Sequence, residues 1–273
     1  MTGGALEAVL RRDRLVVAVS LGAIVALAWG YVFWLANDMD MGGMDMTGFR
    51  MIPAGIGIMA PANAPWKAIE FAFVFAMWAV MMVGMMAPSA APMILMYARV
   101  GRQGQTEGKP FAPAGWFAGG YFLVWTGFSL AATTVQWGFE RADLLDSQMA
   151  SVSNVLGGIV LVLAGVYQWT PLKDRCLVQC QSPVGFLMRH GGFRSDATGC
   201  LVLGMRHGAY CVGCCWLLMA LLFVGGVMNV LWIALLALLV LVEKLAPFGR
   251  WVARVAGIAC VAAGVWILLS PRN

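Results

Sequence analysis

The stretch GCLVLGMRHGAYCVGCCWLLMALL, residues 199–222, decides the fold class of this chain. Apart from Arg206 and His207 it is built almost wholly of apolar and small residues. A bilayer core of about 30 Å requires about 20 such residues in a helix. The stretch therefore predicts a membrane-spanning helix, and the remaining sequence shows whether it stands alone.

The rest of the chain has the same apolar character. Over 273 residues, 61% are hydrophobic and 11% are charged, whereas soluble chains carry about 25% charged residues. This composition excludes an ordinary soluble domain. The net charge of +5 is consequently interpreted as a sign of membrane topology, with no nucleic-acid partner expected.

Seven apolar segments are long enough to cross a bilayer, which predicts an all-α integral membrane protein. They are residues 15–36, 68–97, 115–138, 151–170, 199–222, 227–243 and 251–270. Pro88 and Pro92 fall in the second segment and predict a tilt or bend there. We expect residues 1–66 to form an N-terminal helix with an outer loop, and residues 67–273 to form a six-helix core.

Basic residues predict the orientation of these spans. With the N-terminus inside, the inner loops and helix ends hold thirteen of them, namely Arg11, Arg12, Arg14, Arg99, Arg102, Lys109, Lys173, Arg175, Arg189, Arg194, Lys244, Arg250 and Arg254. The outer side holds only four, Arg50, Lys67, Arg141 and Arg272. Since basic residues favour the cytoplasmic side, the N-terminus is predicted to be cytoplasmic and the C-terminus outside.

The fifth span carries a stripe of potential metal ligands. At about 100° per residue, four of them fall within roughly 60° of Cys200, namely His207, Cys211, Cys214 and Cys215. Thiols and imidazole suit Cu(I), with Zn(II) as the alternative. Two other interpretations stay open: small residues that pack helices closely, and a disulfide to another helix.

Methionines form the second part of the predicted metal path. Met81 and Met85 recur on one face of the second span, at about the depth of the thiols, and thioethers also suit Cu(I). In the first outer loop, Met39, Met41 and Met44 alternate with aspartates. The alternatives are that the methionines of the second span fill gaps in the core, and that those of the outer loop belong to a solvated segment without a binding role.

The inner loop, residues 171–198, adds Cys176 and Cys180 at a spacing that puts both thiols on one helix face. They could receive an ion that leaves the membrane. Three polar residues in or beside the spans, Arg206, Asn229 and Glu243, are assigned structural roles. Glu243 is expected to pair with Arg206 or His207.

Four motifs in order resemble a bacterial family of predicted metal-binding integral membrane proteins, some of which are labelled copper chaperones. The motifs are MMVGMMAPSAAPM, YQWTPLKDRCLVQCQSP, GMRHGAYCVGCCWLLM and GVMNVLWIALLALLVLVEKLAPFG. The resemblance covers about residues 70–250. It implies a metal-binding protein of the bacterial inner membrane, and the positions that it carries over are Cys176, Cys180, His207, Cys211, Cys214, Cys215, Asn229 and Glu243.

Three classes of function follow. The first is a copper-binding membrane protein, not expected to be an enzyme, that captures the ion and delivers or translocates it through a Cys/His/Met cluster. Its partners would be the lipid bilayer, the metal ion and a periplasmic or membrane cuproprotein. The second is a membrane thiol–disulfide redox protein. The third is a non-catalytic assembly or interaction subunit whose cysteines only pack.

Overall fold

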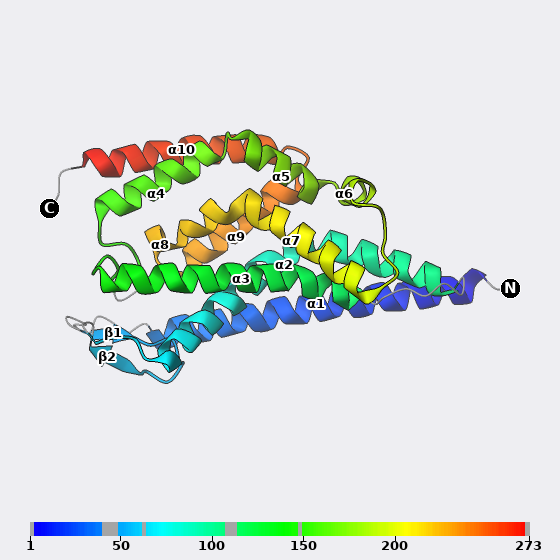
Figure 1. Cartoon of the computed structure of the whole chain (residues 1–273), viewed down its shortest axis with the longest axis horizontal. Helices are drawn as coiled ribbons and strands as arrows, with labels where there is room; N and C mark the ends of the chain where they lie inside the picture. The colour runs from blue at the N-terminus through cyan, green and yellow to red at the C-terminus, as the bar shows by residue number, and fades with distance from the viewer. Residues whose placement is uncertain (1–2, 40–48, 62–63, 107–113, 147–148, 271–273) are drawn as a thin grey trace.

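A computed structural model describes residues 3–39, 49–61, 64–106, 114–146 and 149–270, which are mostly helical (Figure 1). The helices in chain order are α1 (Gly3–Met39), α2 (Ala68–Thr106), α3 (Ala114–Arg141), α4 (Asn154–Tyr167), α5 (Pro171–Gln181), α6 (Pro183–Arg189), α7 (Ala197–Ala220), α8 (Leu222–Gly225), α9 (Val230–Leu245) and α10 (Gly249–Leu269). Two short antiparallel strands, β1 (Phe49–Met51) and β2 (Met59–Pro61), form a hairpin between α1 and α2.

Four of the described helical segments are long and apolar enough to cross a membrane, namely Leu15–Met39, Ala68–Val100, Ala197–Gly225 and Gly249–Leu269. A fifth is added if α4 and α5, which meet at a bend of 66°, count as one broken span. The predicted number of seven is thus not confirmed. At 14 and 16 residues, α4 and α9 alone are short of a full span, and α3 is rich in glycine, threonine and tryptophan, which lower its hydropathy.

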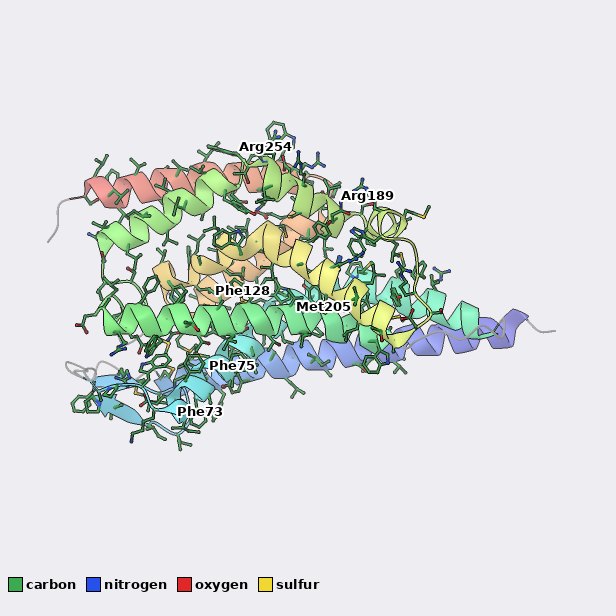
Figure 2. All side chains as sticks on the ribbon, viewed as in Figure 1. Phe73, Phe75, Phe128, Arg189, Met205 and Arg254 are labelled. Carbon is green, nitrogen blue, oxygen red and sulfur yellow. The ribbon has the colours of Figure 1, made fainter. Side chains whose placement is uncertain are left out.

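The long helices pack side by side in layers. α1 lies along α2 on one side, α3 lies against both α2 and α7 in the middle, and α4 pairs with α10 on the other side (Figure 1). The N- and C-termini lie at opposite ends of the long axis. Mostly apolar side chains cover the outer faces, as Figure 2 shows, and large hydrophobic residues such as Leu27, Leu238 and Trp266 are exposed there. Such a surface is typical of a protein that faces lipid.

The residues expected to form an inner loop contain two helices. Thr170 caps α5 by accepting a hydrogen bond from the amide of Lys173, and Pro171 follows at the first helical position. Ser182 caps α6 in the same way, again before a proline. Because α5 turns away from α4, it packs against α7. This fold brings the cysteines of the expected loop to the thiol-bearing helix.

Glycines allow α3 and α7 to approach closely. A Cβ atom placed on Gly120 would lie 2.1 Å from the carbonyl oxygen of Leu201, and one on Gly204 would lie 2.0 Å from that of Phe117. Both clashes are with backbone atoms, which cannot move aside in the way that a flexible side chain can. Small residues therefore set the distance between the two helices.

We expect Gly120→Ala to lower the free energy of unfolding by about 1–3 kcal/mol, because the methyl group would force α3 away from α7. The matched control is Gly119→Ala, one position earlier on α3, where an added Cβ meets nothing within 4 Å. Reversible unfolding in detergent, followed by tryptophan fluorescence, measures both. Equal stability of the two variants would contradict this account of the packing.

Candidate functional site

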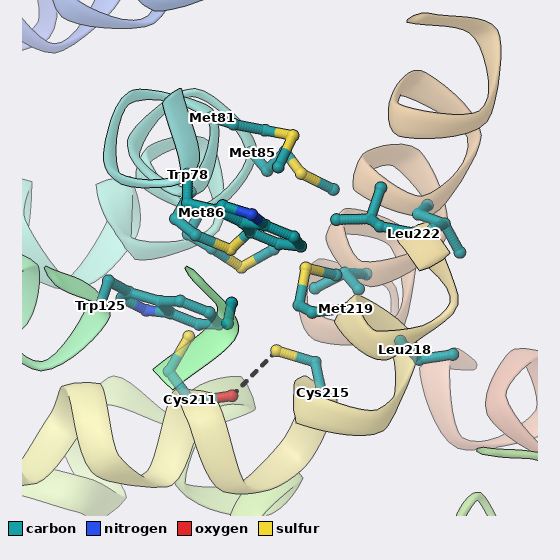
Figure 3. Close-up of a cluster of buried hydrophobic side chains, with 14 of the residues drawn as sticks. Trp78, Met81, Met85, Met86, Trp125, Cys211, Cys215, Leu218, Met219 and Leu222 are labelled. Atoms are coloured by element: carbon teal, nitrogen blue, oxygen red, sulfur yellow. Dashed lines mark hydrogen bonds between the residues drawn. The ribbon is translucent and has the colours of Figure 1, made fainter. Parts of the chain in front are cut away.

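Three cysteines of α7 form the centre of the candidate site. Cys211, Cys214 and Cys215 are all buried, and the thiols of Cys214 and Cys215 both donate to the carbonyl oxygen of Cys211 at 3.0 Å. Figure 3 shows Cys211 and Cys215 pointing from α7 toward α2. The helix periodicity thus places these three thiols together on the inward face.

A lysine lies among these sulfur atoms. Lys244, at the end of α9, has 3% of its surface exposed. Its Nζ atom is 2.8 Å from Cys211 Sγ, 3.7 Å from Cys215 Sγ and 3.8 Å from Met86 Sδ. The hydroxyl of Ser89, at 3.4 Å, completes the surroundings. An ammonium group is therefore held among three sulfur atoms and one oxygen atom from two other helices.

Two further residues position this arrangement. The Tyr121 hydroxyl, from α3, lies 2.9 Å from Cys211 Sγ and 3.3 Å from the Met86 carbonyl oxygen. The Ser89 hydroxyl donates to the same carbonyl at 2.9 Å. These contacts tie α2, α3 and α7 together at the level of Cys211, so this sulfur atom lies where three helices meet.

The cysteines of α5 reach the same region. The partly exposed thiol of Cys180 lies within interaction range of the thiols of Cys211 and Cys214. Cys176 is buried against α7, where a Cβ atom on Gly213 would lie 2.8 Å from its sulfur. The Tyr167 hydroxyl donates to the Gly213 carbonyl and joins the end of α4 to the same place. The structure therefore brings four thiols, those of Cys180, Cys211, Cys214 and Cys215, into one group, with Cys176 beside it.

In the described part of the chain, no three His, Cys, Asp or Glu side chains are arranged as a ready site for a metal ion. The thiols of Cys214 and Cys215 instead donate to a backbone carbonyl oxygen, and the ammonium of Lys244 donates to Cys211 Sγ. All seven cysteines are free thiols. Chemically, the arrangement offers soft donors in a buried place, and thiolates and thioethers of this kind bind Cu(I) and related ions.

His207 lies apart from the thiol group, although it shares their helix face. Its ring is buried among Phe117, Tyr121 and Phe186, with ring centroids 5.0–5.8 Å away. Among the described residues its Nδ1 atom has no hydrogen-bond partner. The structure thus places this histidine in an aromatic pocket one turn before Cys211.

Cys200, the first residue of the predicted stripe, is also separate from the thiol group. Its sulfur atom lies 3.2 Å from the Tyr97 hydroxyl and donates to the Arg194 carbonyl oxygen at 3.3 Å. It is fully buried. Its contacts bind the start of α7 to the end of α2, so they serve packing.

The methionines that the sequence singled out lie in different places. Met81 and Met85 are buried in α2, and Figure 3 shows them in a cluster with Trp78 and Leu222. The neighbouring Met86 is the methionine that contacts Lys244. Met39, at the end of α1, is buried, whereas Met41 and Met44 lie outside the described residues.

Three polar residues assigned structural roles have the following surroundings. Asn229 caps α9 by accepting a hydrogen bond from the amide of Trp232 at 3.1 Å. Arg206 is exposed and lines a cavity of about 260 Å³ with His190, Arg194 and Asp196.

Glu243 contacts neither Arg206 nor His207 among its described hydrogen bonds. It accepts from Lys173 at 2.6 Å and from Gln168 at 3.0 Å. The expected pairing of Glu243 was therefore wrong, because α5 supplies a lysine closer to it.

A second polar cluster lies at the hairpin end of the bundle. Arg50 donates to Glu70 at 2.9 Å and lies 3.9 Å from Glu140, which also accepts from the Trp66 indole at 2.9 Å. Burial raises the pKa of the Glu140 carboxyl group above its ordinary value. This cluster fixes β1 and the start of α2 onto the end of α3, and it contains no sulfur atom.

The sequence prediction missed Lys244, Tyr121, Met86 and Ser89 as members of the site. Lys244 was counted among the inner basic residues, because lysine near a helix end is usually solvated. Lys244 directly follows Glu243 in a helix that is otherwise free of charge. This position was the feature of the sequence that could have indicated a buried role for Lys244. Which neighbouring helix its long side chain would reach depends on tertiary packing.

Comparison with known proteins gives one positive result. A family model described as PpoB2, copper chaperone, matches residues 75–267. No curated protein and no solved structure matches the chain. The matched range contains all of the residues that meet around Lys244.

Proposed function

This chain belongs to the PpoB2 copper chaperone family, and from that premise we propose that it binds Cu(I) as a cargo ion at the thiol group of α5 and α7 and delivers it across or out of the membrane. The ligands would come from Cys180, Cys211, Cys214 and Cys215. Met86 would add a thioether. The family name supports copper, and the soft character of the donors supports its monovalent form.

One observation carries this proposal: thiols from two separate segments, residues 176–180 and 211–215, converge, and all of them except the partly exposed Cys180 are buried. Cysteines that merely allow close packing need not meet one another. Here Cys180 of α5 lies within interaction range of two thiols of α7. An ion held by Cys211 and Cys214 could pass to Cys180, the most exposed member of the group, and then to an acceptor.

The other residues have supporting roles. Met81, Met85 and the outer methionines Met39, Met41 and Met44 are proposed as a path toward the thiols, and Cys176 as a second receiving thiol beside Cys180. His207 would line the approach. We place the protein in the bacterial inner membrane with its N-terminus inside, and the apolar helices together with the opposite positions of the two termini support this placement.

The metal content of the purified chain tests the proposal. Protein is prepared anaerobically in detergent from copper-supplemented cells, and mass spectrometry measures copper and zinc together. We expect close to one copper per chain and little zinc, because cysteine thiolates and thioethers favour Cu(I). X-ray absorption at the copper edge should show a shell dominated by sulfur.

The same preparation examines the thiol–disulfide alternative. A redox protein would accumulate a disulfide between α5 and α7, with Cys180 and either Cys211 or Cys214 as the candidate pair. Acid quenching followed by thiol alkylation and peptide mass spectrometry detects such a bond. A stoichiometric disulfide without copper would overturn the copper proposal and favour the redox function.

A further inference from the structure

We propose that Lys244 is the residue that makes the site selective for monovalent ions: its ammonium group is held beside the sulfur atoms that would bind the cargo, and it repels an incoming ion in proportion to the ionic charge. This inference rests on the proposed function and specifies the class of ion that the site accepts. It is drawn from the surroundings of Nζ and from the charges of its neighbours.

The surroundings of Nζ resemble a coordination shell more than a salt bridge. Cys211, Cys215 and Met86 present sulfur atoms at 2.8–3.8 Å, and Ser89 presents an oxygen atom at 3.4 Å. These donors come from α2 and α7, whereas the lysine comes from α9. The lysine side chain thus reaches into a cage whose donors come from two other helices.

The acidic residue next to Lys244 in the sequence is engaged elsewhere. A buried ammonium group is costly unless a negative charge lies beside it. Glu243 precedes it directly but pairs with Lys173, and none of the ion pairs among the described residues involves Lys244. The group closest to Nζ is the sulfur of Cys211. The ammonium group therefore lies directly against the sulfur atom that would bind the cargo.

Charge balance then distinguishes between ions. An ion bound to these sulfur atoms lies next to the ammonium group of Lys244. The repulsion between the two is proportional to the ionic charge. A divalent ion would also bring an additional positive charge into a region of low dielectric constant, where uncompensated charge is expensive. Both effects favour the monovalent ion.

The test compares a soft monovalent ion with a soft divalent ion, using Ag(I) and Cd(II), which do not change oxidation state. Affinities are measured by chelator competition on the reduced, metal-free full chain in detergent. Lys244→Leu removes the charge without adding a ligand, and Lys244→Gln keeps a donor for Cys211. Lys244→Arg is the matched control that retains the charge.

We expect both neutral variants to bind Ag(I) at least about tenfold more tightly than the wild type. The gain for Cd(II) should be about the square of the gain for Ag(I), at least about 100-fold, because a Coulomb energy doubles with the charge of the ion. Lys244→Arg should stay within about threefold of the wild type for both ions. A purely structural effect would not scale with ionic charge.

Unchanged or weaker Ag(I) binding in the neutral variants would overturn the inference, as would an equal gain for the two ions. Circular dichroism and gel filtration verify that each variant is folded. If the Lys244→Leu variant fails to insert into the membrane, the comparison is made with Lys244→Gln, whose amide can replace the hydrogen bond to Cys211. Failure of the proposed function is recognised separately, because wild-type protein would then bind no Ag(I) before any substitution is made.

Discussion

The triple substitution Cys211→Ser, Cys214→Ser, Cys215→Ser is expected to abolish bound copper while the protein still inserts into the membrane. Serine keeps the size of cysteine closely and preserves a hydrogen bond to a backbone carbonyl, but its oxygen is a poor ligand for Cu(I). Cys211→Ser alone should weaken Cu(I) binding by more than about 100-fold. Loss of a group that only orients a ligand already costs about 10–100-fold, and Cys211 is at the centre of the group.

The control for this experiment lies on the same helix. Cys200 is as deeply buried as Cys211, but its sulfur contacts Tyr97 and the Arg194 carbonyl oxygen. Cys200→Ser can retain both hydrogen bonds and should keep full copper occupancy. Chelator competition under anaerobic conditions measures the affinities. Equal loss of copper in Cys200→Ser and Cys211→Ser would show that general damage to α7, and not a missing ligand, explains the result.

The second large effect is expected at the buried ion pair between α5 and α9. Lys173 and Glu243 are almost completely buried, with Nζ and Oε2 2.6 Å apart. The Gln168 amide donates to the other carboxylate oxygen of Glu243 at 3.0 Å, and its own oxygen accepts from Lys173. Lys173→Met would leave the carboxylate without a cation, which typically lowers the free energy of unfolding by about 3–5 kcal/mol.

Reversible unfolding in mixed micelles, followed by tryptophan fluorescence, measures this loss. Lys67→Met is the matched control, because Lys67 is exposed. Removing both charges in Lys173→Met/Glu243→Leu should restore most of the stability, since an apolar pair can replace a buried ion pair at little cost. A loss of less than about 1 kcal/mol in Lys173→Met would mean that water or Gln168 compensates the carboxylate.

The sequence was sufficient to predict much of α7. Its apolar length predicted a helix, and its periodicity placed Cys211, Cys214 and Cys215 on one face, where the structure finds all three buried. The same argument included Cys200 and His207, which the structure separates from the thiol group. Periodicity specifies a direction around the helix, whereas the neighbours of each residue depend on which helix lies opposite it.

The number of spans and the place of α5 could not be obtained in this way. Residues 171–181 are polar enough to resemble a loop, yet Thr170 and Pro171 begin a helix there and Lys173 is neutralised by a residue 70 positions later. Counting basic residues likewise treated Lys173 and Lys244 as solvent-facing charges. Both are buried, because each has a partner that sequence-local rules do not consider.

The Lys173–Glu243 pair also has a consequence for how the chain is made. Synthesis proceeds from the N-terminus, so Lys173 leaves the ribosome 70 residues before its partner. During that interval α5 carries an uncompensated charge, which opposes its burial among apolar helices. We therefore expect α5 to settle against α7 only after α9 has been made. The thiol group would then be completed late, when α9 brings Glu243 to Lys173 and, one residue later, Lys244 to Cys211.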